Sequence, residues 1–188
     1  MIPDIKELSV KTEIQNYITR EVGILEPLDD DCDVTAKDIQ QIATICNSPT
    51  VFDMLFADLS AFKGRRYGPE DADFFVSKKS RAEWRDVKAF VYVARNSNGQ
   101  IVCAVDIKSP EIQDAEIGYW ADPDNPGWMT NSVIALTRIA KKAGFKRLFG
   151  LVRLGNVRSE KVLSNAGFTL VGEVMTNDIQ YNRYEMLL

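Results

Sequence analysis

The sequence predicts an α/β fold with one mixed, mostly antiparallel sheet and helices on both faces. Apolar residues recur at helical spacing through much of residues 35–85 and then alternate at every second position over residues 87–107. Further along, strand and helix patterns alternate, as they do in a βαβ unit. The 188 residues, 45% of them hydrophobic, are enough for one well-filled core. We therefore expect a single domain over residues 21–188, preceded by a helical extension over residues 1–20.

The first half of that domain is expected to begin with a strand and to continue in helices. Residues 22–28 have the composition of a short strand, and the acidic turn that follows suits the start of a helix. Residues 35–46 place their apolar side chains on one stripe, and residues 52–62 continue at helical spacing. A third helical segment is expected over residues 69–85.

The second half is expected to supply most of the sheet. Residues 87–93 and 101–107 alternate on either side of the turn sequence NSNG at residues 96–99, which predicts an antiparallel hairpin. Strands follow over Ala115–Ala121 and Arg147–Arg153, separated by a helix that starts near Met129 and ends at Gly144. A second helix, between the cap residue Asn156 and Gly167, leads to strands over residues 169–174 and 181–187.

Composition excludes several kinds of chemistry. The chain has no histidine, which rules out serine and cysteine triads that need imidazole as well as histidine-ligated zinc. Its three cysteines are widely spaced and form no C-x-x-C pair, so we expect no metal site and a reducing, cytoplasmic environment. Residues 1–20 carry many charges and no apolar run, and no later stretch is long and apolar enough for a membrane span.

Charge is unevenly distributed along the chain. Residues 1–75 carry 7 Lys/Arg against 15 Asp/Glu, whereas residues 76–188 carry 16 against 12. A basic second half suits a phosphorylated ligand and an acidic first half suits a cation, although two differently solvated surfaces explain the asymmetry equally well. The glycine before the Met129 helix allows a close approach to that helix N-terminus, where phosphates bind, but a turn glycine has the same appearance. No nucleotide-binding glycine motif is present.

Several short motifs in the second half occur in a distinctive combination. They are the run AEIGYW at residues 115–120, Asp122-Pro123, GWMT at residues 127–130, Asn156 followed by Ser159, and NAGF at residues 165–168. This combination resembles the GNAT superfamily of acetyl-CoA-dependent N-acetyltransferases, and within it the branch of ribosomal-protein alanine N-acetyltransferases. The resemblance is specific over residues 86–188 and rests on element order alone over residues 22–85.

The resemblance implies a GNAT-like fold in which the strands Ala115–Ala121 and Arg147–Arg153 splay apart and admit the pantetheine arm of acetyl-CoA. The residues it implies for cofactor binding are Trp120, Ala121, Asp122, Gly127, Trp128, Met129, Thr130, Asn156 and Ser159. Basic side chains on the two following helices are expected near the adenosine 3'-phosphate. The family's pyrophosphate loop falls on residues 124–129, where Asp124, Asn125 and Pro126 depart from its consensus.

The same resemblance implies the catalytic groups. Without histidine the base must be a carboxylate, and Glu116 stands on the splayed strand on the same face as Trp120. A backbone N–H near Trp120 or Ala121, at a bulge in the strand, is expected to polarise the thioester. Many relatives carry a tyrosine acid seven residues after the Asn, but this chain has Leu163 there, so Ser159 is the substitute that the branch suggests. Tyr119 and Tyr181 are lesser candidates. Exposed-strand and helix-cap roles remain open for Glu116 and Asn156.

The implied activity is transfer of an acetyl group to a primary amine, by direct attack in a ternary complex. The amine belongs to a protein or peptide N-terminus or to a small molecule, and the first-half helices and the last hairpin are expected to receive it. The acidic residues of 29–33 and 70–73 are candidates to attract it. The candidates to line its pocket are Phe52, Phe56, Phe74, Phe75 and Trp84, although their helical spacing favours a core role. Two alternatives stay open: a catalytically weak acyl-CoA-binding sensor or protein-interaction module, and a structural domain that binds no anion. Nothing in the sequence indicates a nucleic acid or membrane partner, and a homodimer is an open alternative to a monomer.

Overall fold

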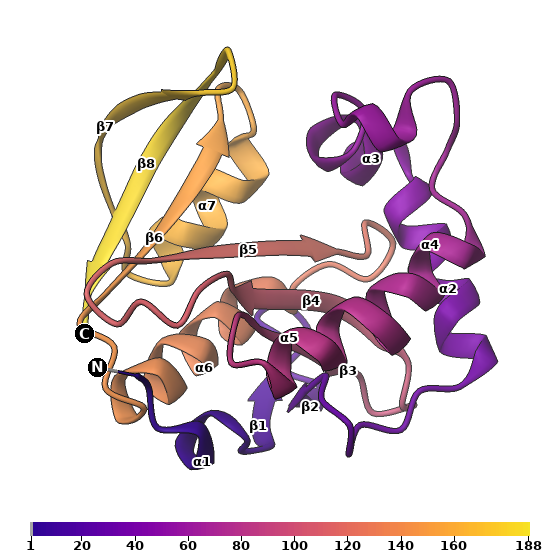
Figure 1. Cartoon of the computed structure of the whole chain (residues 1–188), viewed down its shortest axis with the longest axis horizontal. Coiled ribbons are helices and arrows are strands. Elements are labelled where there is room, and N and C mark those ends of the chain that lie inside the picture. Colours follow the sequence, from indigo (N-terminus) through magenta and orange to yellow (C-terminus); the bar gives the residue numbers. More distant parts are fainter. Residues whose placement is uncertain (1) are drawn as a thin grey trace.

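The computed structural model describes residues 2–188 and contains one sheet in the order β1-β2-β3-β4-β5-β6-β8-β7. Figure 1 shows how the C-terminal strands turn away from the rest of the sheet. The bounds of the strands are β1 Thr12–Gln15, β2 Val22–Pro27, β3 Phe90–Arg95, β4 Ile101–Ile107, β5 Ala115–Ala121, β6 Arg147–Arg153, β7 Thr169–Thr176 and β8 Ile179–Leu187. All neighbours pair antiparallel except β5 and β6, so the predicted mixed, mostly antiparallel sheet is confirmed.

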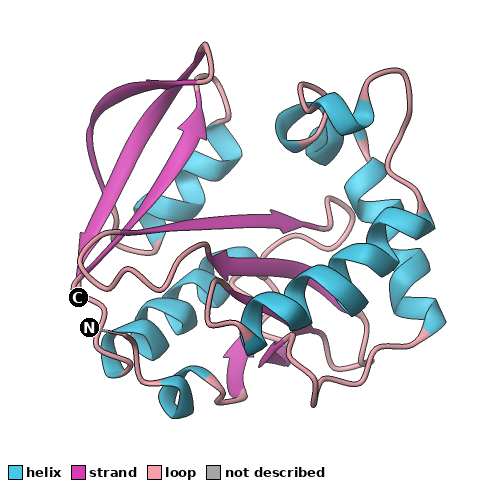
Figure 2. Ribbon diagram, in the orientation of Figure 1, coloured by secondary structure: helices cyan, strands magenta, loops and turns pink. Residues whose placement is uncertain are grey.

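Helices cover the sheet from two sides (Figure 2). Their bounds are α1 Ile5–Leu8, α2 Ala36–Asn47, α3 Pro49–Leu55, η1 Ser60–Phe62, α4 Pro69–Asp73, the π-helical turn η2 Phe74–Ser80, α5 Arg81–Arg85, α6 Met129–Lys142 and α7 Val157–Asn165. The first-half helices α2 to α5 lie on one side. On the other side α6 packs on β4 and β1, and α7 contacts α6, β6 and β7.

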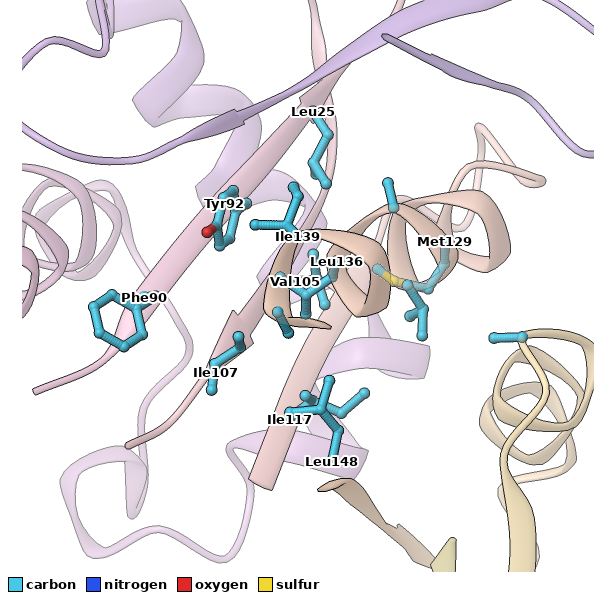
Figure 3. Packing of buried hydrophobic residues seen from close by; sticks show 14 of the residues in the cluster. Leu25, Phe90, Tyr92, Val105, Ile107, Ile117, Met129, Leu136, Ile139 and Leu148 are labelled. Atoms are coloured by element: carbon cyan, nitrogen blue, oxygen red, sulfur yellow. The ribbon is translucent and has the colours of Figure 1, made fainter. Parts of the chain in front are cut away.

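The sheet separates two hydrophobic clusters. One contains inward residues of α6 and the alternate strand residues that face them, among them Tyr92, Val105 and Ile117 (Figure 3). The other contains apolar residues of α2 to α4 together with Val91, Val93 and Trp120. Alternate residues of one strand therefore enter opposite clusters, which is the arrangement expected where both faces are covered. We call these two sides the α6 face and the α2 face.

Residues 1–20 differ from the expected helical extension. Only Ile5–Leu8 is helical, and Thr12–Gln15 forms edge strand β1, which pairs with β2 through Thr12↔Leu25 and Gln15↔Val22. Leu8 is completely buried, and its carbonyl accepts a hydrogen bond from the Tyr92 hydroxyl at 2.8 Å. The prediction of helix is wrong for residues 12–15, because four residues of β1 carry too weak a periodicity to identify a strand.

Two further boundaries differ from prediction. The expected helix over residues 52–62 is divided into α3 and η1, and the strand expected from residue 87 begins at Phe90. Val87 lies in the left-handed region at φ 53°, and the Lys88 N–H donates to the Glu83 carbonyl at 2.8 Å. This bond closes the C-terminus of α5, so residues 87 and 88 belong to a helix cap rather than to a strand.

The elements that flank β5 and β6 agree closely with expectation. Gly144 and Gly167 adopt positive φ values of 98° and 96° where α6 and α7 end. Asn156 caps α7 by accepting a hydrogen bond from the Ser159 N–H at 3.2 Å. The second half therefore has the strand-helix-strand-helix order that its sequence predicts.

Candidate functional site

The parallel strands β5 and β6 separate partway along their length. Their register pairs Ala115 with Leu148 and Ile117 with Gly150 and extends no further, so the four residues of β5 after Ile117 leave β6 (Figure 1). Since a parallel ladder normally continues along both strands, this divergence exposes backbone groups that would otherwise be paired. The two predicted splayed strands are thus confirmed.

The ladder between β4 and β5 decides which β5 amides face the gap. Asp122 N–H donates to the Val102 carbonyl at 2.8 Å, and Lys108 N–H donates to the Glu116 carbonyl at 2.9 Å. These bonds, with the register Ala104↔Trp120, direct the Trp120 N–H toward β4 and the N–H groups of Tyr119 and Ala121 toward the gap. The β4–β5 register runs without a shift, so the bulge expected near Trp120 is absent and the alternation of the strand itself exposes the amides.

Backbone donors also meet the gap from the start of α6. No side chain caps this 14-residue helix, and the N–H groups of Met129, Thr130 and Asn131 have no acceptor among the described residues. Free N–H groups and the positive end of the helix dipole attract anions. The Met129 and Thr130 side chains themselves are buried, so these residues offer their backbones rather than their side chains.

The loop before α6 is shaped by Asp122 and by the N-terminal segment. Asp122 accepts hydrogen bonds from the Asp124 N–H at 2.9 Å and from the Asn125 side chain at 2.7 Å. On its other side, buried Asn16 donates to the Pro126 carbonyl at 3.0 Å, and the Tyr17 N–H donates to the Gly127 carbonyl at 2.7 Å. The turn after β1 therefore holds the carbonyls of Pro126 and Gly127, while the N–H groups of Asp124 and Asn125 are bonded to Asp122.

Gly127 is required for this contact. Its φ is 101°, and a Cβ there would lie 2.2 Å from the Asn16 Oδ1 atom. Both the positive φ and the close approach exclude a side chain. Trp128, buried next to it, fills the space over Gly23. Packing alone thus accounts for Gly127 and Trp128, whether or not they also contact a ligand.

Asn156 and Ser159 lie together at the start of α7. Besides the cap, the Ser159 hydroxyl lies 2.6 Å from the Tyr119 hydroxyl, which joins α7 to β5 across the gap. Burial raises the pKa of Tyr119, an effect that the hydrogen bond with Ser159 opposes, so the phenol is protonated at neutral pH.

Leu163 occupies the helix position at which relatives carry a tyrosine. It is completely buried, and a Cβ on Gly150 of β6 would lie 2.9 Å from one of its methyl groups. Leu163 therefore packs α7 against β6 and supplies no hydroxyl.

Glu116, the predicted base, projects from β5 on the α2 face. It pairs with the Lys108 ammonium group and is about 29% exposed. Next to it on the same face, the Asp106 carboxylate accepts a hydrogen bond from the Gly118 N–H at 2.7 Å. Burial raises the pKa of Asp106 above its ordinary value, against the opposing effects of Lys108 and of this hydrogen bond.

A pocket of about 190 Å³ opens on the α2 face beside Asp106. Its walls are Leu55, Phe56, Tyr67, Phe75, Val91, Ala104, Val105, Gly118, Tyr119 and Trp120, and its charged groups are Lys79, Asp106 and Lys108. Two of the aromatic candidates, Phe56 and Phe75, line this pocket. Phe52 and Trp84 are core residues, and Phe74 points outward with 55% of its surface exposed.

The acidic residues expected to attract the acceptor lie elsewhere. Asp30 pairs with Arg85 and Asp71 with Arg65, and no acidic residue of 29–33 or 70–73 lines the 190 Å³ pocket. Sequence analysis missed Asp106, because one acidic residue within an apolar strand forms no recognisable motif or spacing. It also missed Asn16, which lies 110 residues from the loop that it holds.

The described residues contain no group of three or more Cys, Asp or Glu side chains arranged to hold a metal ion. Cys32, Cys46 and Cys103 are free and buried, and burial raises the pKa of Cys103 to about 12. Over residues 2–188, none of the helices has both the length and the apolar character of a membrane span.

Comparison with known structures identifies the arrangement. RimJ from Mycobacterium smegmatis in complex with CoA-disulfide has a TM-score of 0.76 at 18% identity, over 100% of this chain and 90% of that chain. RimL, a ribosomal L7/L12 α-N-protein acetyltransferase in complex with CoA, has a TM-score of 0.69 at 19% identity, over 94% and 98% of the two chains. The ribosomal-protein-S5-alanine acetyltransferase of Vibrio fischeri has a TM-score of 0.68 at 18% identity, over 95% and 96%.

Sequence comparison gives the family. None of the curated proteins matches the sequence. The model of the acetyltransferase (GNAT) domain, however, matches residues 33–169, well over half of the chain. The resemblance seen in the motifs of residues 115–168 is thereby confirmed, and the similar structures above come from the branch that those motifs indicated. The chain belongs to the GNAT family of acetyltransferases.

Proposed function

We propose that this acetyltransferase moves the acetyl group of acetyl-CoA to a primary amine by direct attack in a ternary complex. The observation that carries the proposal is the divergence of β5 from β6 beside the uncapped N-terminus of α6. This arrangement combines an opening for an extended arm with donors for a diphosphate. The family assignment and the CoA-bound structures of RimJ and RimL support the same cosubstrate.

The pyrophosphate is assigned to backbone N–H groups at the start of α6, namely those of Trp128, Met129 and Thr130, with Gly127 allowing close approach. Asp122 acts indirectly by holding the loop through the Asp124 N–H. The Asn156 amide is assigned to the pantetheine arm in addition to its cap. Every one of these assignments uses a group whose position is fixed by the fold, so binding requires little reorganisation.

We assign the polarisation of the thioester carbonyl to a backbone N–H group of β5 beyond Trp120. Of the two amides expected there, the ladder favours the Ala121 N–H, since the Trp120 N–H is directed at β4. A donor aimed at the oxyanion of the tetrahedral intermediate stabilises the transition state more than the ground state.

The leaving thiolate is assigned a proton from the Ser159 hydroxyl. A serine alone is a weak acid, but Ser159 lies 2.6 Å from Tyr119, whose phenol is protonated at neutral pH. The hydroxyl pair therefore supplies the hydrogen bonding and the proton that Leu163 cannot supply. Glu116 remains a candidate for the base on the opposite face of the sheet.

The alternative is a catalytically weak acyl-CoA-binding sensor or interaction module. Leu163 favours it, since a buried methyl-bearing side chain replaces an acid, and so does the anionic Asp124 in the loop. Turnover separates the two. A sensor binds acetyl-CoA and releases no free thiol when amines are added.

The test is an acetyl-transfer assay that detects free CoA thiol, with peptides bearing free α-amines and the same peptides with blocked N-termini as controls. Thiol release that requires a free amine, with one acetyl group gained per peptide by mass spectrometry, is the expected result. Binding of acetyl-CoA without release for any amine contradicts transfer and supports the sensor.

Location and assembly form a further part of the proposal. The three buried thiols support the expectation of a reducing compartment, the cytoplasm. Edge strand β7 exposes Leu170, Val171 and Met175, which supports a homodimer as the assembly to test by analytical ultracentrifugation.

A further inference from the structure

We propose that Asp106 binds the acceptor amine and accepts its proton, and that the pocket beside it selects an amine next to an apolar or aromatic side chain. This inference rests on the proposed acetyl transfer and names the amine-binding group and the substrate class of that site. Three features carry it: the position of the carboxylate at the separation of β5 and β6, the composition of the pocket, and the charges that face the carboxylate.

The Asp106 carboxylate lies where the two parallel strands part. Asp106 pairs across the sheet with Gly118, the residue directly after the last pair between β5 and β6. A Cβ on Gly118 would lie 2.6 Å from the Lys108 Cε atom and 2.7 Å from the Asp106 Oδ1 atom, so the Lys108 side chain and the carboxylate both lie over this glycine. The absence of a side chain at residue 118 lets the carboxylate approach the gap from the α2 face, opposite to Ser159 and Asn156.

The pocket has the character of a site for one apolar side chain. Its aromatic walls are Phe56, Tyr67, Phe75 and Trp120, joined by Leu55, and its volume of about 190 Å³ is below the range typical for whole drug-sized ligands. Asp106 stands among these walls as the acidic group of the lining. An amine adjacent to an apolar side chain satisfies both features, because the ammonium group meets the carboxylate while the side chain fills the pocket.

The charges around Asp106 come from four elements. Lys79 approaches from η2, Lys108 from the end of β4, Glu83 from α5 and Glu116 from β5. Lys108 is paired with Glu116, which offsets the charge of both. Asp106 by contrast has a backbone amide as its hydrogen-bond donor, and its pKa is raised by burial, which brings a carboxylate closer to the pH at which a base works well.

The ammonium group of the acceptor gives one proton to the Asp106 carboxylate, and the nitrogen lone pair forms a C–N bond to the thioester carbonyl carbon. The C–S bond breaks, and the thiolate takes the proton of the Ser159 hydroxyl. The nitrogen still carries one proton more than the amide product, and it gives this proton back to the hydroxyl pair of Ser159 and Tyr119. Asp106 returns its proton to solvent, so turnover releases one proton, CoA thiol and the acetylated amine.

The test compares Asp106→Asn with the matched variant Glu116→Gln, using acetyl-CoA and short peptides that differ only in their first residue. Asparagine retains an oxygen to accept the Gly118 N–H, so the local hydrogen bond is kept. We expect Asp106→Asn to lower kcat/KM for the amine by about 100-fold at neutral pH, with the loss shrinking as pH rises, because general-base catalysis contributes at least that factor. Glu116→Gln tests the other candidate base, and its loss of kcat/KM is expected to be the smaller of the two. The Kd of acetyl-CoA from calorimetry stays within about 2-fold in both variants, since neither residue is assigned to the cofactor.

Two further measurements provide a second test, which does not depend on whether an Asp106 variant folds. The acidic limb of the kcat/KM profile is expected above the ordinary aspartate range. In Glu116→Gln it should persist but move to lower pH, because Lys108 then lacks its partner beside Asp106. Peptides beginning with Phe or Leu are expected to exceed those beginning with Gly by about 10-fold. Loss of that limb in Glu116→Gln, full activity of Asp106→Asn, or equal rates for all first residues would overturn the inference while acetyl transfer stands. Absence of transfer to every amine, with acetyl-CoA still bound, would instead overturn the proposed function and this inference together.

Discussion

The two sides of β5 are built on different principles. On the α6 face, the gap is lined by backbone N–H groups, helix termini and a short hydroxyl pair, all placed by the strand-helix-strand-helix order. On the α2 face, the pocket is lined by side chains from α3, η2 and the strands. A site made of backbone groups tolerates changes of side chain, whereas a pocket made of side chains changes with each substitution. The sequence motifs of the family therefore identify the cosubstrate but do not identify the acceptor.

The α2 face is held by an ion-pair network centred on Arg95. Arg95 donates to Glu26 at 2.7 Å and to Asp38 at 2.9 Å, and it also binds the carbonyls of Asp33 and Gly99. All three charged side chains are largely buried, at 17% exposure for Arg95 and 9% for each carboxylate. Arg95→Met is expected to lower the free energy of unfolding by about 3 kcal/mol, the largest effect here, because it leaves Asp38 without a cation and Glu26 with Lys11 as its partner. Urea unfolding of the wild type and the variant measures this change in the free energy of unfolding.

Acid supplies the matching test of this network. Burial raises the pKa of Glu26 and Asp38, but hydrogen bonds outweigh that effect and lower both pKa values. Lys11 and Arg95 act on Glu26, and the Thr35 N–H and Arg95 act on Asp38. A lowered pKa contributes stability above the ordinary carboxyl pKa that is lost as pH falls through the lowered value. The loss of unfolding free energy caused by Arg95→Met is thus expected to shrink as the pH falls from about 5 to about 2. A deficit independent of pH would mean that Arg95 acts by packing alone.

On the α6 face, the next largest effect is expected at Gly127. Gly127→Ala forces a side chain into a positive φ and against Asn16, and is expected to cost about 2 kcal/mol of stability. If the loop also holds the pyrophosphate, the affinity for acetyl-CoA falls in protein that is still folded. Asn16→Ala is the matched control, since it removes the contact without changing Gly127. Calorimetry at a temperature where all variants are folded separates the two roles, and unchanged affinity in Gly127→Ala would limit this residue to packing.

A smaller effect, on turnover alone, is expected at the hydroxyl pair that spans the gap. Ser159→Ala and Tyr119→Phe each remove one hydroxyl of the 2.6 Å contact, and each is expected to lower kcat by about 10-fold, or about 1.4 kcal/mol. The double variant should lose little more than either single variant, because the two groups act as a unit. Additive losses in single-turnover rates would show that the hydroxyls act separately.

The smallest effect is expected at the α7 cap. Asn156→Ala removes the acceptor of the Ser159 N–H and is expected to cost about 1 kcal/mol of stability. Asn156→Ser keeps a capping oxygen while removing the amide donors, so its stability should stay close to wild type. Weaker binding of acetyl-CoA in both variants is the expected sign of a cofactor contact. Normal binding by Asn156→Ser would leave Asn156 as a cap only.

The sequence predicted the α6 face better than the α2 face for physical reasons. Strong periodicity, Gly144 and Gly167 at helix ends and the Asn156 cap are local signals, and each is confirmed. β1 was missed because four residues carry no clear period, and the contact of Asn16 with Pro126 joins distant parts of the chain. The role of Asp106 depends on Gly118 of the neighbouring strand, so only the register of β4 with β5 reveals it.

The central claim, that the gap between β5 and β6 takes acetyl-CoA, is tested most directly by calorimetric titration of the chain with acetyl-CoA, with 3'-dephospho-CoA and desulfo-CoA as controls. The account predicts a single site with micromolar affinity, weaker binding of the dephospho form, and a rise in unfolding temperature on binding. Neither heat nor a rise in unfolding temperature at millimolar acetyl-CoA would contradict it.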